Sequence, residues 1–184
     1  MRETSSKAAQ SDAAEPASQG MSFMSDPIRI IAWGNIGRRD DGAALVLADR
    51  LATRYDGVED VLIQEYHQLG PELVDDLHHC RLAIFIDAHT KPDAGDVICE
   101  RIAPARVGGM DTHHCPPEVL LGLTAAMNLR VPEAWLIGIR GHDWEFGDTL
   151  SGLARRAMLE AEQQAIRLVE QTRRPSENDS RPPL

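Results

Sequence analysis

The sequence predicts an α/β fold, a three-layer α/β/α sandwich built around a mostly parallel five-stranded sheet. Short apolar runs of strand length alternate along the chain with stretches in which apolar residues recur at helical spacing. Turns that carry glycine or proline separate the two kinds of segment. Because a helix after each strand returns the chain to the same end of the sheet, this alternation favours parallel strands covered by helices.

Five segments have the composition of strands. The run Ile28–Trp33 is apolar except for Arg29, and the run 82–86 is wholly apolar, as expected of a central strand that is covered on both faces. The remaining predicted strands span residues 58–66, 97–102 and 134–139.

Four segments are predicted to be helical. The first begins near Asp41, and the second follows Gly70-Pro71 and reaches residue 77, with proline in the first turn, where its missing N–H costs nothing. The third follows Pro116-Pro117, and the fourth begins near Ser151, a good N-cap residue. Helical spacing places these residues in the core: Leu120, Leu123 and Met127 in the third helix, and Leu153, Ala157, Ala161, Ala165 and Leu168 in the fourth.

Length and composition limit the class of protein. The 184 residues suffice for one domain, which we place at 27–172, and we expect residues 1–26 and 173–184 to be disordered because they lack apolar periodicity. The net charge of −10 argues against nucleic acid or an anionic membrane as the main partner. No segment resembles a membrane span or a signal peptide, and three cysteines without a Cys-x-x-Cys pair suit a reduced, cytoplasmic protein. We expect a monomer.

The turn after the first strand contains two adjacent carboxylates, Asp40 and Asp41. Spacing alone slightly favours a structural interpretation, in which one caps the following helix and the other lies near the positive end of its dipole. The alternative is that Asp41 points into the crevice at the carboxyl end of the strands, where open α/β sheets bind ligands. Phosphate binding is not expected, since no phosphate-binding pattern is met and two carboxylates would repel an anion.

Two further polar groups follow predicted strands. Asp87 comes directly after the run 82–86, where the simpler interpretation is a turn residue. His113 and His114 precede Cys115 on a third loop, and a histidine there is by itself more often structural. Together, however, two carboxylates and an imidazole at one edge of the sheet would suit nickel or zinc better than calcium or magnesium.

The motif Gly34-Asn35-x-x-x-x-Asp40-Asp41-Gly42 resembles the N-terminal signature of the hydrogenase maturation endopeptidases. These enzymes remove a C-terminal extension from the large subunit of nickel-iron hydrogenases. Other segments of the chain are similar to the family in the same order, namely Gln68–Leu73, Ile86-Asp87-Ala88, Thr112-His113 and Phe146–Ser151.

The resemblance implies a function and a set of site residues. Asp41, Asp87 and His113, with His114 as the alternative ligand, would coordinate nickel that arrives with the hydrogenase large-subunit precursor, or another divalent ion in its place. The metal would position the scissile peptide and polarise its carbonyl or a water. Asp40 and Asn35 would support Asp41 without touching the metal.

The chain departs from the family pattern at a few positions. Arg38 and Arg39 stand where family members often have apolar residues, and they would add positive charge that could meet carboxylates of the substrate tail. Ala44 replaces a second glycine.

Other functions compete with this interpretation. One is a metal-dependent hydrolase of a different substrate, and another is a nickel-dependent hydrogenase assembly chaperone that cleaves nothing. A cysteine protease using Cys115 lacks an orienting third group, and no Gly-x-Ser-x-Gly elbow is present. A pepsin-like pair would require Asp41 and Asp87 to share a proton at near contact, which the sequence does not indicate.

Overall fold

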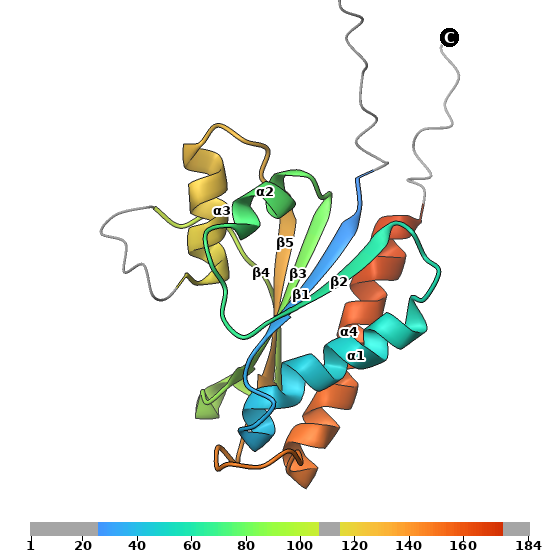
Figure 1. Ribbon diagram of the computed structural model, residues 1–184, viewed down its shortest axis with the longest axis vertical. Helices are drawn as coiled ribbons and strands as arrows, with labels where there is room; N and C mark the ends of the chain where they lie inside the picture. The colour runs from blue at the N-terminus through green and yellow to red at the C-terminus, as the bar shows by residue number, and fades with distance from the viewer. Residues whose placement is uncertain (1–25, 107–114, 175–184) are drawn as a thin grey trace, which may run out of the picture.

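The computed structural model describes residues 26–106 and 115–174 (Figure 1). His113, His114 and almost all of the predicted leader and tail lie outside these ranges, so the predictions made for them remain predictions.

A five-stranded sheet forms the centre of the molecule, in the strand order β2-β1-β3-β5-β4. The first four of these are parallel to one another, and the edge strand β4 runs antiparallel to β5. This arrangement confirms the predicted mostly parallel sheet. The strands are β1 (Ile28–Trp33), β2 (Val61–Tyr66), β3 (Leu82–His89), β4 (Val97–Arg101) and β5 (Glu133–Arg140).

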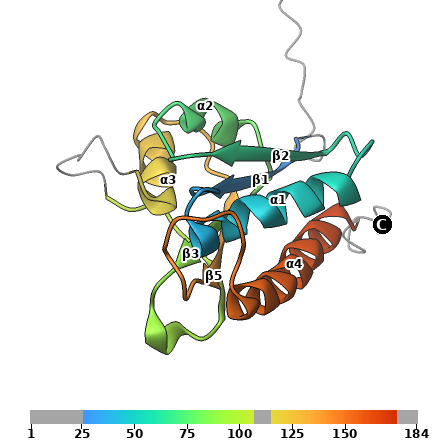
Figure 2. The same cartoon turned by 60° about the horizontal axis from the view of Figure 1, so that its bottom comes forward.

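Helices cover both faces of the sheet, as the sequence predicts. Helices α1 and α4 pack side by side on one face, and α2 and α3 lie on the other (Figures 1 and 2). The helices are α1 (Ala43–Arg54), α2 (Leu73–His78), α3 (Pro117–Ala126) and α4 (Gly152–Arg173), with two short 3₁₀ helices, η2 (Arg39–Gly42) and η3 (Pro92–Ala94).

Two apolar layers hold the helices to the sheet, because successive strand residues point to opposite faces. Ile30 and Ile84 contribute to the layer beneath α1 and α4, whereas their neighbours Ile31 and Phe85 contribute to the layer beneath α2 and α3. All four side chains are fully buried. The central strands β1 and β3 therefore have the two-sided apolar composition from which they were predicted.

The predicted inner face of α4 is confirmed at Ala157, Ala161 and Ala165, which are buried, but not at Leu153. Leu153 is 45% exposed, and the buried face begins instead at Ala154 and continues through Ala157, Met158 and Ala161. The Ala154 N–H donates to Ser151 Oγ, which fixes the first turn so that Leu153 points outward. Met127, predicted to be in the core, is also exposed, because α3 ends at Ala126.

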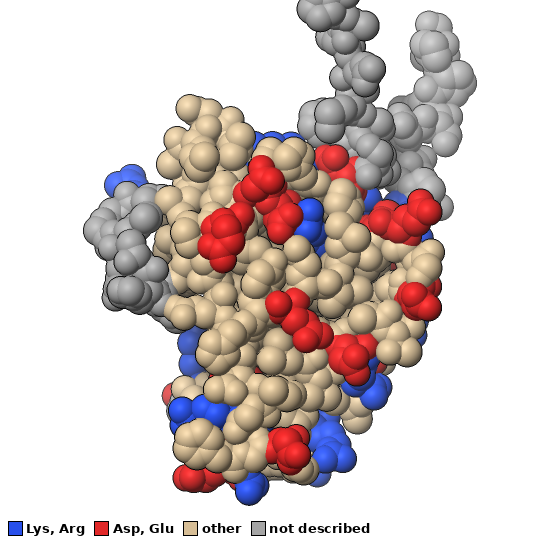
Figure 3. Space-filling model, in the orientation of Figure 1, with Lys and Arg blue, Asp and Glu red and all other residues tan. Residues whose placement is uncertain are grey.

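The face shown in Figure 3 carries charges of both signs. Asp and Glu form several separate groups over its upper and middle part, Lys and Arg lie mostly toward its edges and lower end, and no continuous basic surface is present among the described residues of that face. Within the described ranges, no helix combines the length and the apolar character needed to cross a membrane.

Candidate functional site

An open cleft of about 520 Å³ lies at the carboxyl end of the sheet, beside β1 and β3. These strands are neighbours in the sheet. From β1 the chain continues through α1 to β2, which lies on the far side of β1 from β3, whereas from β3 it continues to β4 and β5, which lie on the far side of β3 from β1. The order of the strands thus reverses here, and open α/β sheets bind ligands at such switch points. Asp41 and Asp87, both predicted site residues, line the cleft.

The turn after β1 brings Asp41 to the cleft through a close backbone approach at Gly34. Gly34 has a φ of +149°, and a Cβ added there would lie 2.1 Å from the carbonyl oxygen of Asp41. Only glycine fits this contact without displacing the backbone. Asn35 tightens the same turn, because its Oδ1 accepts a bond of 2.9 Å from the Gly37 N–H. The glycine and the asparagine of the motif therefore shape the loop that carries Asp41.

Asp87 lies in a part of β3 that extends beyond β1. The last paired residues of these strands are Ala32 and Ile86, whereas β3 continues beside β5 as far as His89. The strand therefore extends past the predicted apolar run 82–86, since β5 still pairs with Asp87, Ala88 and His89. By strand alternation, Asp87 shares the face of Phe85, on the side of α2 and α3.

The surroundings of Asp87 oppose its ionisation. Burial is the main cause, and the charge of Asp41 adds to it, whereas the Ala88 N–H, 2.8 Å from Asp87 Oδ1, acts in the opposite direction. The net effect raises the pKa of Asp87 to about 7. The two carboxylates are therefore close enough to repel each other, and a cation between them would relieve that repulsion.

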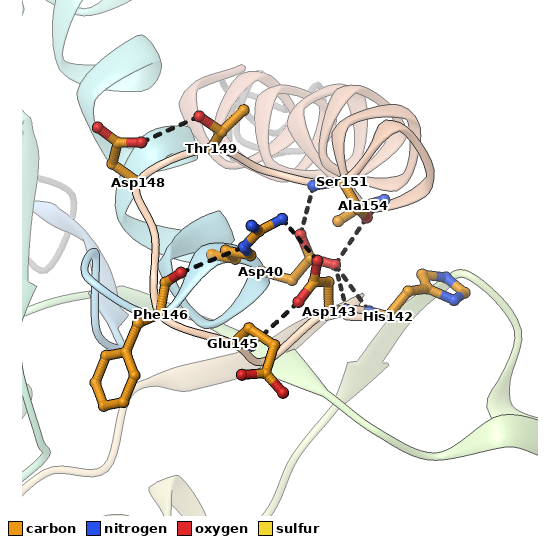
Figure 4. Close-up of polar contacts among 10 residues, drawn as sticks. Asp40, His142, Asp143, Glu145, Phe146, Asp148, Thr149, Ser151 and Ala154 are labelled. Atoms are coloured by element: carbon orange, nitrogen blue, oxygen red, sulfur yellow. Dashed lines mark hydrogen bonds and ion pairs between the residues drawn. The ribbon is translucent and has the colours of Figure 1, made fainter.

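Asp40 points away from the cleft and holds the β5–α4 loop. Its fully buried carboxylate accepts bonds from the N–H groups of His142 (2.8 Å), Asp143 (2.9 Å) and Ser151 (2.7 Å), and from Ser151 Oγ (2.7 Å) (Figure 4). Burial alone would raise the pKa of Asp40, but these hydrogen bonds outweigh it and hold the pKa below its ordinary value. Neither Asp40 nor Asp41 caps η2 or α1 through its side chain, so the capping interpretation is wrong.

The two arginines of the turn have different surroundings. Arg39 forms a 2.8 Å ion pair with Asp143 and so joins the turn to the same β5–α4 loop. Arg38 is exposed, lines the cleft and lies with its guanidinium 5.4 Å from the centre of the Phe146 ring. Only Arg38 therefore fits the expectation of a cation facing the site. Figure 2 shows how the loop curls around the start of α1.

The rest of the cleft wall includes residues that were not predicted. His67 and Gln68 follow the end of β2, next to β1, and Glu118 lies in the first turn of α3. The position of His67 directly after a predicted strand was the signal that could have identified it. Cys115 also lines the cleft, but burial, with a smaller contribution from Glu72, raises the pKa of its thiol. A neutral thiol is a poor nucleophile, which counts against the cysteine-protease alternative.

Two of the predicted metal ligands, Asp41 and Asp87, lie in the described part of the cleft wall, which also contains Glu118 and His67. The predicted third ligand, His113 or His114, is outside the described residues. Cys115, which follows them directly in the chain, forms part of the cleft wall. Carboxylate oxygens from Asp41 and Asp87 together with an imidazole nitrogen would form a ligand set that suits a borderline divalent ion.

A second group of potential ligands was missed by the sequence analysis. Asp75, His78 and His79 offer ligand atoms that all lie within 4.8 Å of one another. They come from α2 and the residue after it, and their spacing of three and four residues along a helix was the available signal.

Comparison with known proteins identifies structures of the same fold. The hydrogenase maturating endopeptidase HybD from E. coli matches with a TM-score of 0.64 at 17% identity, over 79% of this chain and 93% of that chain. HybD from Thermococcus kodakarensis, a NiFe hydrogenase maturation protease, matches with a TM-score of 0.60 at 21% identity, over 77% and 98% of the two chains. HycI from the same organism matches with a TM-score of 0.57 at 22% identity, over 82% of this chain and 95% of that chain. No protein-family model and no curated protein sequence matches the chain. At these identities the likeness establishes a shared fold.

Proposed function

We propose that this protein is an endopeptidase that removes the C-terminal extension of a nickel-loaded hydrogenase large-subunit precursor. The observation that carries the proposal is the convergence of Asp41 and Asp87 on one open cleft at the switch point of the sheet. The solved structures named above support it, because proteins called a hydrogenase maturating endopeptidase or a NiFe hydrogenase maturation protease have the same fold.

The two carboxylates fit the role of receiving a metal that belongs to the substrate. Asp41 and Asp87 repel each other in the absence of a cation, and an incoming Ni²⁺ would remove that repulsion. We assign the third ligand to His113, with His114 as the alternative. What nickel supplies is polarisation of the scissile carbonyl or of a water, while the chain's own residues hold and orient the substrate.

Other residues of the cleft would position the peptide. The cleft is open, so an extended segment can lie in it, and Trp33 and Leu69 offer apolar contacts along its wall. Arg38 is the single Lys or Arg among the described lining residues, and it could pair with a carboxylate of the tail. Asp40 would position Asp41 without touching the substrate. Its four hydrogen bonds fix η2, the segment that contains Asp41, to the β5–α4 loop.

Incubation with a nickel-loaded precursor tests the proposal, with mass spectrometry of the precursor as the readout. The expected result is a precursor shortened at its C-terminus. Asp41→Asn and Asp87→Asn should each abolish the shortening, because they remove the charge that a divalent ion needs while keeping the side-chain size. Asp56→Asn makes the same change at an exposed residue outside the cleft and should process normally.

The alternatives give different results in the same assay. Tight binding of the precursor without a loss of mass would favour an assembly chaperone. Cleavage of unrelated peptides by a protein that retains a tightly bound metal in the cleft would favour a hydrolase with a resident ion. Full processing by both Asp41→Asn and Asp87→Asn would overturn the metal-site hypothesis.

A further inference from the structure

A compact group of metal-ligating side chains lies at the end of α2. Asp75, His78 and His79 present their ligand atoms within 4.8 Å of one another, and Asp75 and His79 are exposed. His78 Nδ1 is 3.9 Å from Asp75 Oδ1, and the two imidazole rings are tilted by 44° to each other with centroids 3.5 Å apart. We propose that this group is a surface binding site for a divalent transition-metal ion, separate from the cleft.

The backbone of α2 orients both imidazoles for coordination. His79 Nδ1 lies 2.9 Å from the carbonyl oxygen of Asp75, and His78 Nδ1 lies 3.4 Å from that of Val74. A carbonyl can only accept, so each Nδ1 donates its proton and the neutral ring keeps a lone pair on Nε2. Metal-binding histidines commonly have one nitrogen held in this way, which fixes the tautomer and the orientation of the ring.

The surroundings favour a cation. The site lies at the carboxyl end of a helix, where the last carbonyl groups give a partial negative charge. Arg130 anchors the backbone, since its Nη2 donates to the His78 carbonyl at 3.1 Å. The positive charge of Arg130 is offset by an ion pair with Asp26.

This site and the cleft cannot share one ion. Helix α2 begins after the carboxyl end of β2 and ends before the amino end of β3, so His78 and His79 lie near the start of β3. Asp87 is five residues beyond Leu82, the first residue of β3. At about 3.3 Å per residue, this places the cleft about 16 Å away along the strand.

The ligand set selects a class of metal. Two imidazoles and one carboxylate suit Ni²⁺, Zn²⁺, Cu²⁺ or Co²⁺, whereas Ca²⁺ and Mg²⁺ prefer all-oxygen sites. Three protein ligands leave positions open for water or for a donor from another molecule.

Nuclear magnetic resonance of the full-length, metal-free protein tests the proposal with Ni²⁺ as the probe. Substoichiometric Ni²⁺ should shift or broaden the backbone amide signals of Leu77 and Cys80, which flank the site. The effect should vanish in the double variant His78→Ala/His79→Ala. A tenfold or larger loss of Ni²⁺ affinity is expected in His79→Ala alone, because removing a residue that only hydrogen-bonds to a metal ligand typically weakens metal binding tenfold or more, and removing the ligand itself should weaken it at least as much. His142→Ala, at an exposed histidine elsewhere, is the matched control and should behave as the unmodified protein.

Two readouts decide the outcome. The amide of Ala88 monitors the cleft independently, and its response to Ni²⁺ should be the same in the unmodified protein and in the α2 variants. If His78→Ala/His79→Ala unfolds, His79→Ala, at an exposed position, still provides the test. The proposal is overturned if the Leu77 and Cys80 signals ignore a tenfold excess of Ni²⁺, or if their response survives in His79→Ala with unchanged affinity.

Discussion

Replacing Asp87 by asparagine tests the electrostatics of the cleft while preserving its shape. Asparagine has the size of aspartate, and its Oδ1 can still accept the bond from the Ala88 N–H, which is 2.8 Å long. The substitution removes a carboxylate whose ionisation is opposed first by burial and then by the charge of Asp41. We therefore expect Asp87→Asn to be more stable than the unmodified protein at alkaline pH.

The sign and size of the effect follow from the pKa of Asp87 in the two states. In the unfolded chain the carboxyl loses its proton near pH 3.8, whereas in the folded protein it keeps the proton until about pH 7. Between these values the folded state binds more protons, so the free energy of unfolding falls by about 1.4 kcal/mol for each unit of rising pH. The full loss from below pH 4 to above pH 7 is at most about 4 kcal/mol.

Urea denaturation between pH 4 and pH 8.5 measures this difference. A chelator should be present, because a bound divalent ion would keep Asp87 ionised. Asp87→Asn should gain up to about 4 kcal/mol over the unmodified protein at pH 8 and nothing near pH 4. The control Asp56→Asn removes a charge from an exposed residue and should show no such pH dependence. The reasoning is refuted if Asp87→Asn and the unmodified protein have the same free energy of unfolding at pH 8. It is also refuted if the difference between them is the same at every pH.

Four further substitutions test the construction of the site. Gly34→Ala should lower the free energy of unfolding by about 2 kcal/mol, because its Cβ would meet the Asp41 carbonyl at 2.1 Å; a neutral effect in urea denaturation would contradict this contact. Asp40→Ala leaves several donors without an acceptor, so it should cost at least about 3 kcal/mol, and a loss below about 1 kcal/mol would show that water replaces the carboxylate. His113→Ala should abolish precursor processing, whereas His114→Ala should retain substantial activity; the reverse result would transfer the ligand role to His114.

The order and type of the elements were predictable because each depends on local periodicity. Strand β1 has the predicted bounds, Ile28–Trp33, and the four helices lie where apolar spacing and proline or serine signals place them. The positions of Asp41 and Asp87 at one edge followed from the same reasoning, since parallel strands end on the same side. Element ends were less accurate: β3 continues past Asp87 because β5 still pairs with it.

The roles of individual polar side chains required the tertiary structure. The sequence determined that two aspartates follow β1, but the contacts that bury Asp40 come from residues more than 100 positions away along the chain. The same long-range loop takes Arg39 into an ion pair and leaves Arg38 at the cleft. Periodicity is a property of neighbours along the chain, and it determined which segments became helix or strand. Which carboxylate is satisfied inside the protein and which faces the cleft depends on distant donors, so only the folded chain decided it.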